Sequence, residues 1–336
     1  MIISKFKGYF LNVILIWLVV LLYKTLPYYI SFIRAETIII ITFIAWAYTI
    51  IGLIYYILIP KQKITKTKGD LFFSLIKKAL IKIIDFLSKT KSNIEITKKE
   101  KVALLFIIVK VFYLPIMINF VIANYFAIKS SFPNLIATNN LFSVSGFNTI
   151  IYPFLLATIF FIDTLWFAFG YATESKLLKN KIVSVEPTFL GWFVALICYP
   201  PFNTMFTNIS NWYANDYVMF SNDIITFIAR IIMILLLGIY VSATLALGTK
   251  ASNLTHRGIV DRGPYRYIRH PAYISKNLVW WITLIPIISW PAIVSMGIWS
   301  VIYHLRSITE ERHLGKDLVY KEYCKRVKYR YIPGVY

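Results

Sequence analysis

The sequence predicts an all-α integral membrane protein with about eight transmembrane segments. Of its 336 residues, 58% are hydrophobic and only 15% are charged, and the mean hydropathy is +0.66. A soluble fold of this length needs a more polar surface, so this composition excludes an ordinary soluble globular protein. The spacing of the apolar runs carries the prediction further, because a transmembrane helix takes roughly 20 apolar residues.

Six apolar runs are long enough to cross a bilayer as single helices. They cover residues 8–24, 37–60, 102–128, 149–171, 188–209 and 223–248. The first run lacks a small-residue cleavage site, so we interpret it as a helix and not as a signal peptide. Residues 278–305 are also apolar but are interrupted by Pro286 and Pro291, and proline cannot continue a regular helix. We therefore expect a helical hairpin there as the last two segments.

The connections between these runs alternate in charge. Lysine and arginine gather after the second, fourth and sixth runs and in the C-terminal tail, whereas residues 25–36, 129–148 and 210–222 are almost free of them. With eight segments, the basic loops and the N- and C-termini all fall on one side, which the positive-inside rule makes the cytoplasm. The net charge of +21 then indicates loops that face anionic membrane lipids, and no nucleic-acid partner.

The first basic loop contains residues 71–87, which mix apolar positions with lysines. This segment is too charged to span, so we predict an amphipathic helix on the inner leaflet. A solvated linker is the alternative, because Lys77, Lys78 and Lys82 do not leave one face of the helix free of charged side chains. Within the spans, Asp163 and Arg230 are costly in lipid. Arg230 is explained at least as well by pairing inside the bundle, and Asp163 is the better candidate for a place near a cavity.

A polar stretch stands between two apolar segments near the C-terminus. Within residues 258–273 it concentrates Asp261, Arg262, Arg266, Arg269 and His270. Membrane proteins rarely place such residues together without using them. We therefore divide the chain into two regions, an N-terminal transmembrane bundle of about six spans over 1–250 and a C-terminal region over 251–336 that carries the candidate active site.

The motif GPYRYIRHPAY at 263–273 is followed by the hairpin, by TEE at 309–311 and then by YKEYCKRV and IPGVY. In this order the pieces resemble the isoprenylcysteine carboxyl methyltransferases and the related phospholipid methyltransferases, which are multi-span membrane enzymes. The resemblance covers about 80 residues from His256 onward. It implies an S-adenosylmethionine-dependent methyltransferase whose acceptor is a lipophilic substrate from the bilayer, either a prenylcysteine-like carboxylate or a lipid head group.

The same resemblance implies the residues of the site. The pair of an arginine and a glutamate four residues later falls on Arg306 and Glu310, which are the candidate catalytic residues. The implied cofactor-binding residues are Arg257, Gly258, Ile259, Val260, Tyr265, Arg269, His270, Pro271, Ala272, Tyr273, Glu310 and Glu311. The three histidines outside the motif show no metal-ligand spacing, so no metal is assigned.

The residue types agree with this assignment. The amino-acid end of the cofactor presents a carboxylate and an ammonium, which need a donor such as His270 and an acceptor such as Glu310. The flat adenine suits Tyr265 and Tyr273. Residues four apart share a helix face, so Arg306 and Glu310 can point into one cavity. Methyl transfer needs chiefly alignment and exclusion of water. An anionic acceptor requires no base, whereas an amine must first lose a proton.

Each of these residues also has a purely structural explanation. His270 can be a buried, hydrogen-bonded histidine, Arg306 and Glu310 an ordinary surface salt bridge, and Glu311 a solvated carboxylate. The sequence also departs from the family, because Ser275, followed by Lys276, stands two positions after Tyr273, where a glycine is usual. A side chain at that point narrows the pocket or changes the approach to it.

Two alternatives of other classes remain open. The tail also resembles the membrane sterol reductases, which transfer hydride from NADPH. Their Asn-Tyr-x-Gly-Asp element is missing, since the matching positions include Ala272, Ser275 and Lys276. A non-catalytic lipid-binding scaffold is the second alternative, and it predicts that no cofactor binds. The richness in isoleucine and lysine suggests a bacterial inner membrane, with the active site on the cytoplasmic side.

Overall fold

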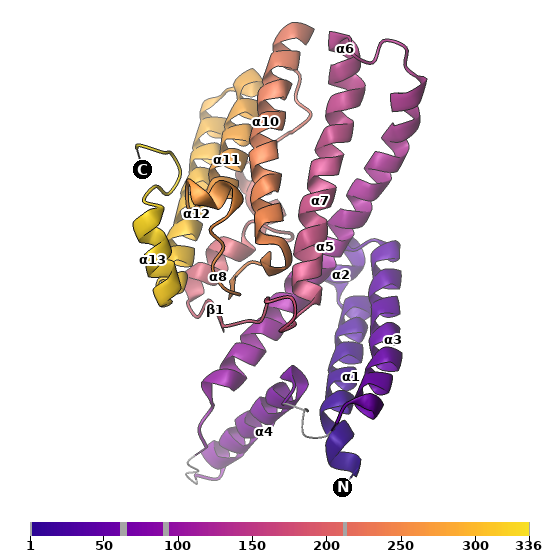
Figure 1. The fold of residues 1–336 in the computed structure, drawn as a ribbon, viewed down its shortest axis with the longest axis vertical. Helices are drawn as coiled ribbons and strands as arrows, with labels where there is room; N and C mark the ends of the chain where they lie inside the picture. The colour runs from indigo at the N-terminus through magenta and orange to yellow at the C-terminus, as the bar shows by residue number, and fades with distance from the viewer. Residues whose placement is uncertain (1, 61–65, 90–93, 211–213, 336) are drawn as a thin grey trace. The chain divides into compact units, whose positions relative to one another are not determined.

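A computed structural model describes residues 2–60, 66–89, 94–210 and 214–335. It is almost entirely helical (Figure 1), apart from one short pair of strands. The chain forms two compact units, Met1–Pro115 and Ile116–Tyr336, whose boundary lies inside α5 (Lys98–Ala137). The division at residue 250 is a functional one and stays a prediction.

The first unit contains four helices and the start of α5. These helices are α1 (Ile2–Thr25), α2 (Pro27–Phe32), α3 (Ala35–Leu58) and α4 (Lys68–Leu87). Buried polar contacts join α1 to α3, where Tyr9 Oη donates to the Thr49 carbonyl at 2.6 Å. The amphipathic segment predicted over 71–87 is helical as α4. It begins with a capping box in which Thr67 and Asp70 satisfy each other's backbone N–H groups. Its placement on a membrane surface stays a prediction.

The second unit holds the remaining elements. In chain order they are α6 (Val144–Gly146), the π-turn η2 (Phe147–Ile151), α7 (Tyr152–Ala172), β1 (Ser184–Val185), α8 (Phe189–Leu196), α9 (Phe202–Ser210), α10 (Asp223–Leu247), η3 (Gly248–Lys250), β2 (Thr255–His256), η4 (Gly263–Arg266), α11 (Pro271–Leu284), η5 (Ile285–Ile287), α12 (Trp290–Leu314) and α13 (Leu318–Arg326).

Five helical stretches in the described residues are long and apolar enough to cross a membrane. They are Phe6–Thr25, Ala35–Leu58, Lys98–Ala137, Val144–Ala172 and Asp223–Lys250, which correspond to five of the six predicted runs. The run at 188–209 is not one helix, because α8 ends at Leu196 and α9 begins only at Phe202. Pro200 and Pro201 stand at this break, and proline lacks the N–H that a helix interior requires. The eight-span count and the cytoplasmic ends stay predictions.

The predicted hairpin is present as α11 and α12, joined by η5. Helix α10 packs against α7 and α11, and α12 packs against α11 and α8 (Figure 1). The core between α7, α10 and α11 is apolar and includes Leu156, Met233, Leu237 and Val279, all 1% exposed or less. This packing fixes the helices that carry the polar residues of the site.

Asp163 and Arg230 both have partners inside the second unit. Arg230 donates to the carbonyls of Asn148 and Tyr217 and lies over the Tyr152 ring at 4.5 Å, which is pairing within the bundle. Asp163 accepts hydrogen bonds from Tyr240 and Thr244, each at 2.6 Å. Both donors, Tyr240 and Thr244, lie on the wall of a cavity in the second unit.

Candidate functional site

The irregular segment between α10 and α11 forms one wall of the site. The strand pair anchors this segment, because Ser184 of β1 pairs with His256 of β2. The Arg257 guanidinium donates to the Thr173 carbonyl at 3.1 Å, which ties the segment to the end of α7. Gly258 then takes a φ of +95°, a backbone conformation that side chains disfavour. The polar stretch identified in the sequence therefore has a defined path across the helix ends.

The C-terminal tail holds the other end of this segment. Arg269 and His270 donate their backbone N–H groups to the carbonyls of Tyr329 and Arg330, at 3.0 and 2.9 Å. The Glu311 carboxylate accepts from Arg269 Nε at 2.8 Å and Arg330 Nη2 at 2.7 Å, and lies 3.0 Å from His270 Nε2. Burial would raise the pKa of Glu311, but the hydrogen bonds from His270 and Arg330 and the charge of Arg269 lower it well below its usual range.

The ion cluster around Glu311 bears on its predicted role in cofactor binding, which stays a prediction. Glu311 was assigned to the cofactor, with a solvated carboxylate as the alternative. Its two oxygens are instead engaged with basic side chains of the motif and the tail, and it lines none of the three cavities described below. We infer that Glu311 positions Arg269 and His270.

The first cavity, of about 640 Å³, lies along the irregular segment. Many of the residues assigned to the cofactor meet on its wall. They are Arg257, Gly258, Ile259, Val260, Tyr265, Arg269, His270 and Glu310. Burial raises the pKa of the Tyr265 hydroxyl, and the negative charge of Glu310 adds to this effect. Tyr265 therefore stays a neutral, flat face on this wall.

The second cavity, of about 690 Å³, reaches between the helices. It shares six residues with the first cavity, so the two adjoin. These are Leu247, Ser252, Tyr265, Arg269, His270 and Glu310. Its remaining lining is rich in aromatic rings and contains two further cations. These residues are Phe167, Tyr199, Tyr240, Thr244, Asn253, Ala272, Tyr273, Lys276, Tyr303 and Arg306. An aromatic cavity among helices is suited to a lipophilic ligand.

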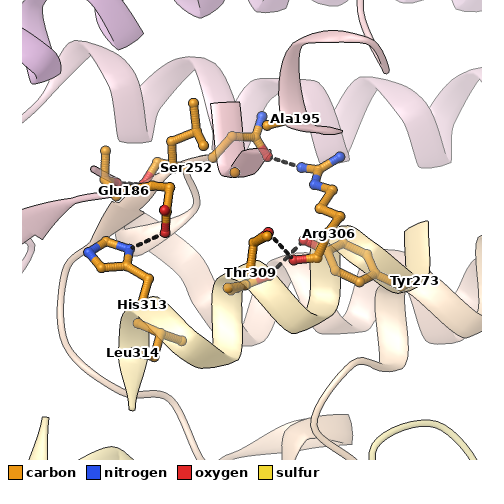
Figure 2. A pocket seen from close by; sticks show the side chains of 13 residues that line it. Glu186, Ala195, Ser252, Tyr273, Arg306, Thr309, His313 and Leu314 are labelled. Atoms are coloured by element: carbon orange, nitrogen blue, oxygen red, sulfur yellow. Dashed lines mark hydrogen bonds and ion pairs between the residues drawn. The ribbon is translucent and has the colours of Figure 1, made fainter. Parts of the chain in front are cut away.

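The third cavity, of about 450 Å³, lies on the other side of Arg306. Figure 2 shows Arg306, Thr309 and His313 projecting from α12 toward Glu186 and Ala195. Glu186 is only 3% exposed, and His313 Nδ1 lies 3.8 Å from its Oε2. Burial lowers the pKa of His313 despite the opposing charge of Glu186. The three cavities share Ser252 and Glu310, so they surround one centre.

The two candidate catalytic residues lie at this centre. Glu310 accepts a hydrogen bond from Tyr273 Oη at 2.7 Å, which bridges α12 and α11. Arg306 is 8% exposed, donates to the side chain of Asn253 and lies over the rings of Tyr273 and Tyr303 at 5.2 and 5.9 Å. Within the described part of the chain no ion pair joins Arg306 to Glu310 or to another carboxylate. This geometry argues against an ordinary surface salt bridge.

A buried guanidinium without a carboxylate partner is costly unless an anion approaches it. Arg306 is therefore a buried cation that has no carboxylate counter-ion among the described residues. The first cavity has the donor set that S-adenosylmethionine requires, with Arg269 and Lys250 as cations, Glu310 as an acceptor and Tyr265 as a flat surface. A Cβ on Gly258 would lie 3.1 Å from Lys250 Nζ, so the bare backbone keeps this wall open.

Sequence reasoning missed several residues of the centre. Thr309 and His313 follow Arg306 at helical spacings of three and seven, and this signal would have found them. Glu186 and Asn253 come from distant segments, and nothing in the sequence joins them to Arg306. Pro271, assigned to the cofactor, is buried at the start of α11 and lines none of the three cavities.

Comparison with curated proteins and with solved structures found no match. A family match covers residues 224–321, from the start of α10 to the beginning of α13. It confirms the resemblance seen in the C-terminal motifs and extends it to α10, where hydropathy alone had been recognised. By this match, residues 224–321 are similar to the phospholipid methyltransferase family.

Proposed function

We propose that this protein transfers a methyl group from S-adenosylmethionine to a lipophilic acceptor that enters from the bilayer. The family match over residues 224–321 supports a membrane methyltransferase acting on lipid-related substrates. The observation that carries the proposal is Arg306, a buried cation with no carboxylate partner among the described residues, which lines both the second and the third cavity. We also propose that this is a multi-pass protein of a bacterial inner membrane. Its site would lie at the cytoplasmic face, and its basic loops would contact anionic lipids.

In this proposal the first cavity takes the cofactor. The backbone of residues 257–260 would lie against the adenosine, with Tyr265 as a flat surface beside it. Tyr273, the second predicted aromatic surface, lines the adjoining second cavity. Arg269 and His270 direct donors toward the amino-acid carboxylate, and Glu310 accepts from the ammonium. When bound, the cofactor supplies an electrophilic methyl group. The protein aligns the two reactants and excludes water, which are the main requirements of an in-line displacement.

The second cavity takes the acceptor. Its aromatic lining suits an apolar chain, and Arg306 at its end holds the polar head of the acceptor beside the methyl donor. Arg306 is kept in place by Asn253 and by the rings of Tyr273 and Tyr303, so little reorganisation is needed on binding.

The test is calorimetric binding of S-adenosylhomocysteine and, separately, of NADPH to the full-length protein in detergent. We expect only S-adenosylhomocysteine to bind. Glu310→Gln should weaken it at least tenfold, because the ammonium loses a charged partner. Glu322→Gln is the matched control, since Glu322 lies exposed on α13 and pairs only with Lys325 in the described structure.

Each other outcome has a defined meaning. Binding of NADPH alone would replace the methyltransferase with a reductase. Binding of neither ligand would favour a lipid-binding scaffold without chemistry. Unchanged affinity in Glu310→Gln would remove Glu310 from the cofactor site.

A further inference from the structure

We propose that Lys276 is a specificity-determining residue that selects acceptors with an anionic oxygen in the head group. This inference rests on the proposed function, because it assigns the second cavity to the acceptor. Lys276 lies on the wall of that cavity, together with Arg306. It also directly follows Ser275, which stands where the family usually has a glycine.

Three aromatic rings surround the Lys276 ammonium. Its Nζ lies 5.1 Å from the centre of the Tyr240 ring, 5.6 Å from Trp280 and 5.7 Å from Phe160. These rings come from α10, α11 and α7, so three helices fix the position of the charge. Ring faces attract a cation but accept no strong hydrogen bond. The aromatic cage therefore holds the ammonium without satisfying its three N–H donors.

No carboxylate satisfies them either. Within the described residues, Lys276 forms no ion pair and no hydrogen bond. Two carboxylates, Asp163 and Asp216, are near enough to interact with the Lys276 charge, but neither lies within ion-pair distance of it. The oxygens of Asp163 already accept from Tyr240 and Thr244. A half-buried ammonium with unused donors on a cavity wall is suited to an anionic ligand group.

Arg306 and Lys276 are linked through the aromatic wall. Arg306 lies over Tyr303, the Tyr303 ring packs edge-on against Trp280 at 5.1 Å, and Trp280 borders Lys276. Arg269, a third cation of this cavity, is paired with Glu311. Glu310 is the only carboxylate on the described lining. On the described lining, two cations without a carboxylate at ion-pair distance thus face one carboxylate, so we expect this lining to favour an oxyanion over an ammonium.

The chemistry of the transfer follows from this charge. A lone pair of the acceptor oxyanion forms the new O–CH₃ bond, while the S–CH₃ bond breaks and its electron pair stays on sulfur. The acceptor loses its negative charge and the sulfonium loses its positive charge. No proton leaves, so no base is required. The methylated product is neutral at that oxygen and has lost its attraction to Lys276, which favours its release.

The experiment measures binding of single-chain amphiphiles of equal length to the full-length protein in a neutral detergent. Tritiated palmitate is displaced by unlabelled palmitate, hexadecyl phosphate, hexadecanol or hexadecylamine in a scintillation proximity assay. We expect both acids to bind more tightly than the alcohol and the amine. The two acids separate a carboxylate preference from a phosphate preference.

Lys276→Met should weaken both acids on the order of tenfold and leave hexadecanol unchanged, because only the charge is removed. Lys276→Arg should restore the preference for acids. Lys321→Met, an exposed lysine on α13, is the matched control. Equal loss of acids and alcohol in Lys276→Met, or no preference for acids in the wild type, would overturn the inference.

Binding of S-adenosylhomocysteine to the same samples separates the two proposals and reports on folding. Lys276 does not line the first cavity, so Lys276→Met should bind this ligand normally. Loss of that binding in Lys276→Met alone would show that Lys276 serves the fold, as a counter-charge to Asp163, and would contradict the selection of acceptors. No binding even in the wild type would refute the proposed function itself.

Discussion

Arg330 Nη2 donates to Glu311 Oε2 at 2.7 Å, and this contact joins the C-terminal tail to the end of α12. Both side chains are about 15% exposed, so the pair is largely desolvated. The same carboxylate also binds Arg269 and His270 of the central motif. One acidic residue therefore keeps three basic groups in place around the candidate cofactor cavity.

Replacing Glu311 by glutamine should destabilise the protein. Removing one partner of a buried ion cluster costs about 3 kcal/mol, because the remaining charges stay buried and uncompensated. We expect the melting temperature in detergent to fall by roughly 5 °C or more. Glu322→Gln breaks only an exposed pair with Lys325 and should change the melting temperature by less than about 2 °C. Equal melting temperatures for the two variants would show that the cluster contributes little.

Stability should also fall as the solution is acidified from pH 7.5 to pH 5.5. Burial lowers the pKa of His256. The negative charge of Asp317 opposes this shift, and the positive charge of Lys250 adds to it. The unfolded chain therefore takes up a proton below about pH 6.5 that the folded chain resists. The stability that neutral His256 contributes is complete above that pH, and it is lost as the pH falls through the pKa of His256 in the folded state. His256→Gln should show a shallower loss of melting temperature, and an unchanged pH slope would contradict this assignment.

Gly258→Ala should weaken cofactor binding without unfolding the protein. Its φ of +95° is strained for any residue with a Cβ, and the new methyl group would lie 3.1 Å from Lys250 Nζ. We expect the affinity for S-adenosylhomocysteine to fall about tenfold, because the substitution introduces about 1 to 2 kcal/mol of backbone strain in the wall of this cavity. Gly297→Ala is the control, because a Cβ there meets nothing within 4 Å. Normal affinity in Gly258→Ala would exclude this segment from the cofactor site.

Arg306→Lys should impair methyl transfer more than cofactor binding. Lysine keeps the charge but loses the planar fork that contacts Asn253 and lies over Tyr273 and Tyr303. A displaced acceptor head costs on the order of 100-fold in rate. A labelled-methyl assay on membrane lipids would measure this loss, and calorimetry with S-adenosylhomocysteine should change little. Arg326→Lys, in an exposed pair with Asp261, should keep full activity.

Much of the fold could be predicted because the signals are local. Apolar runs of sufficient length became α1, α3, α5, α7 and α10, and the prolines at 286 and 291 marked the hairpin. The run at 188–209 is not the single helix that its hydropathy predicts, because Pro200 and Pro201 interrupt it. Those two residues had already indicated that the helix would break there.

The candidate site was predictable only where its residues are close in sequence. Arg257, Tyr265 and His270 belong to one segment, and Arg306 and Glu310 share a helix face, so spacing alone brings them together. The cage around Lys276 needs α7, α10 and α11 at once, and the partners of His313 are Ser184 and Glu186, more than a hundred residues away. Such contacts depend on helix packing, which one sequence does not reveal.

The backbone pairing of Arg269 and His270 with Tyr329 and Arg330 has a consequence for biosynthesis. Residues 329 and 330 leave the ribosome after every helix that lines the three cavities. The motif segment therefore emerges, and its neighbouring helices assemble, before its final backbone partners exist. A nascent chain stalled ahead of residue 329 should carry all the cavity helices and still fail to hold the motif in its binding geometry.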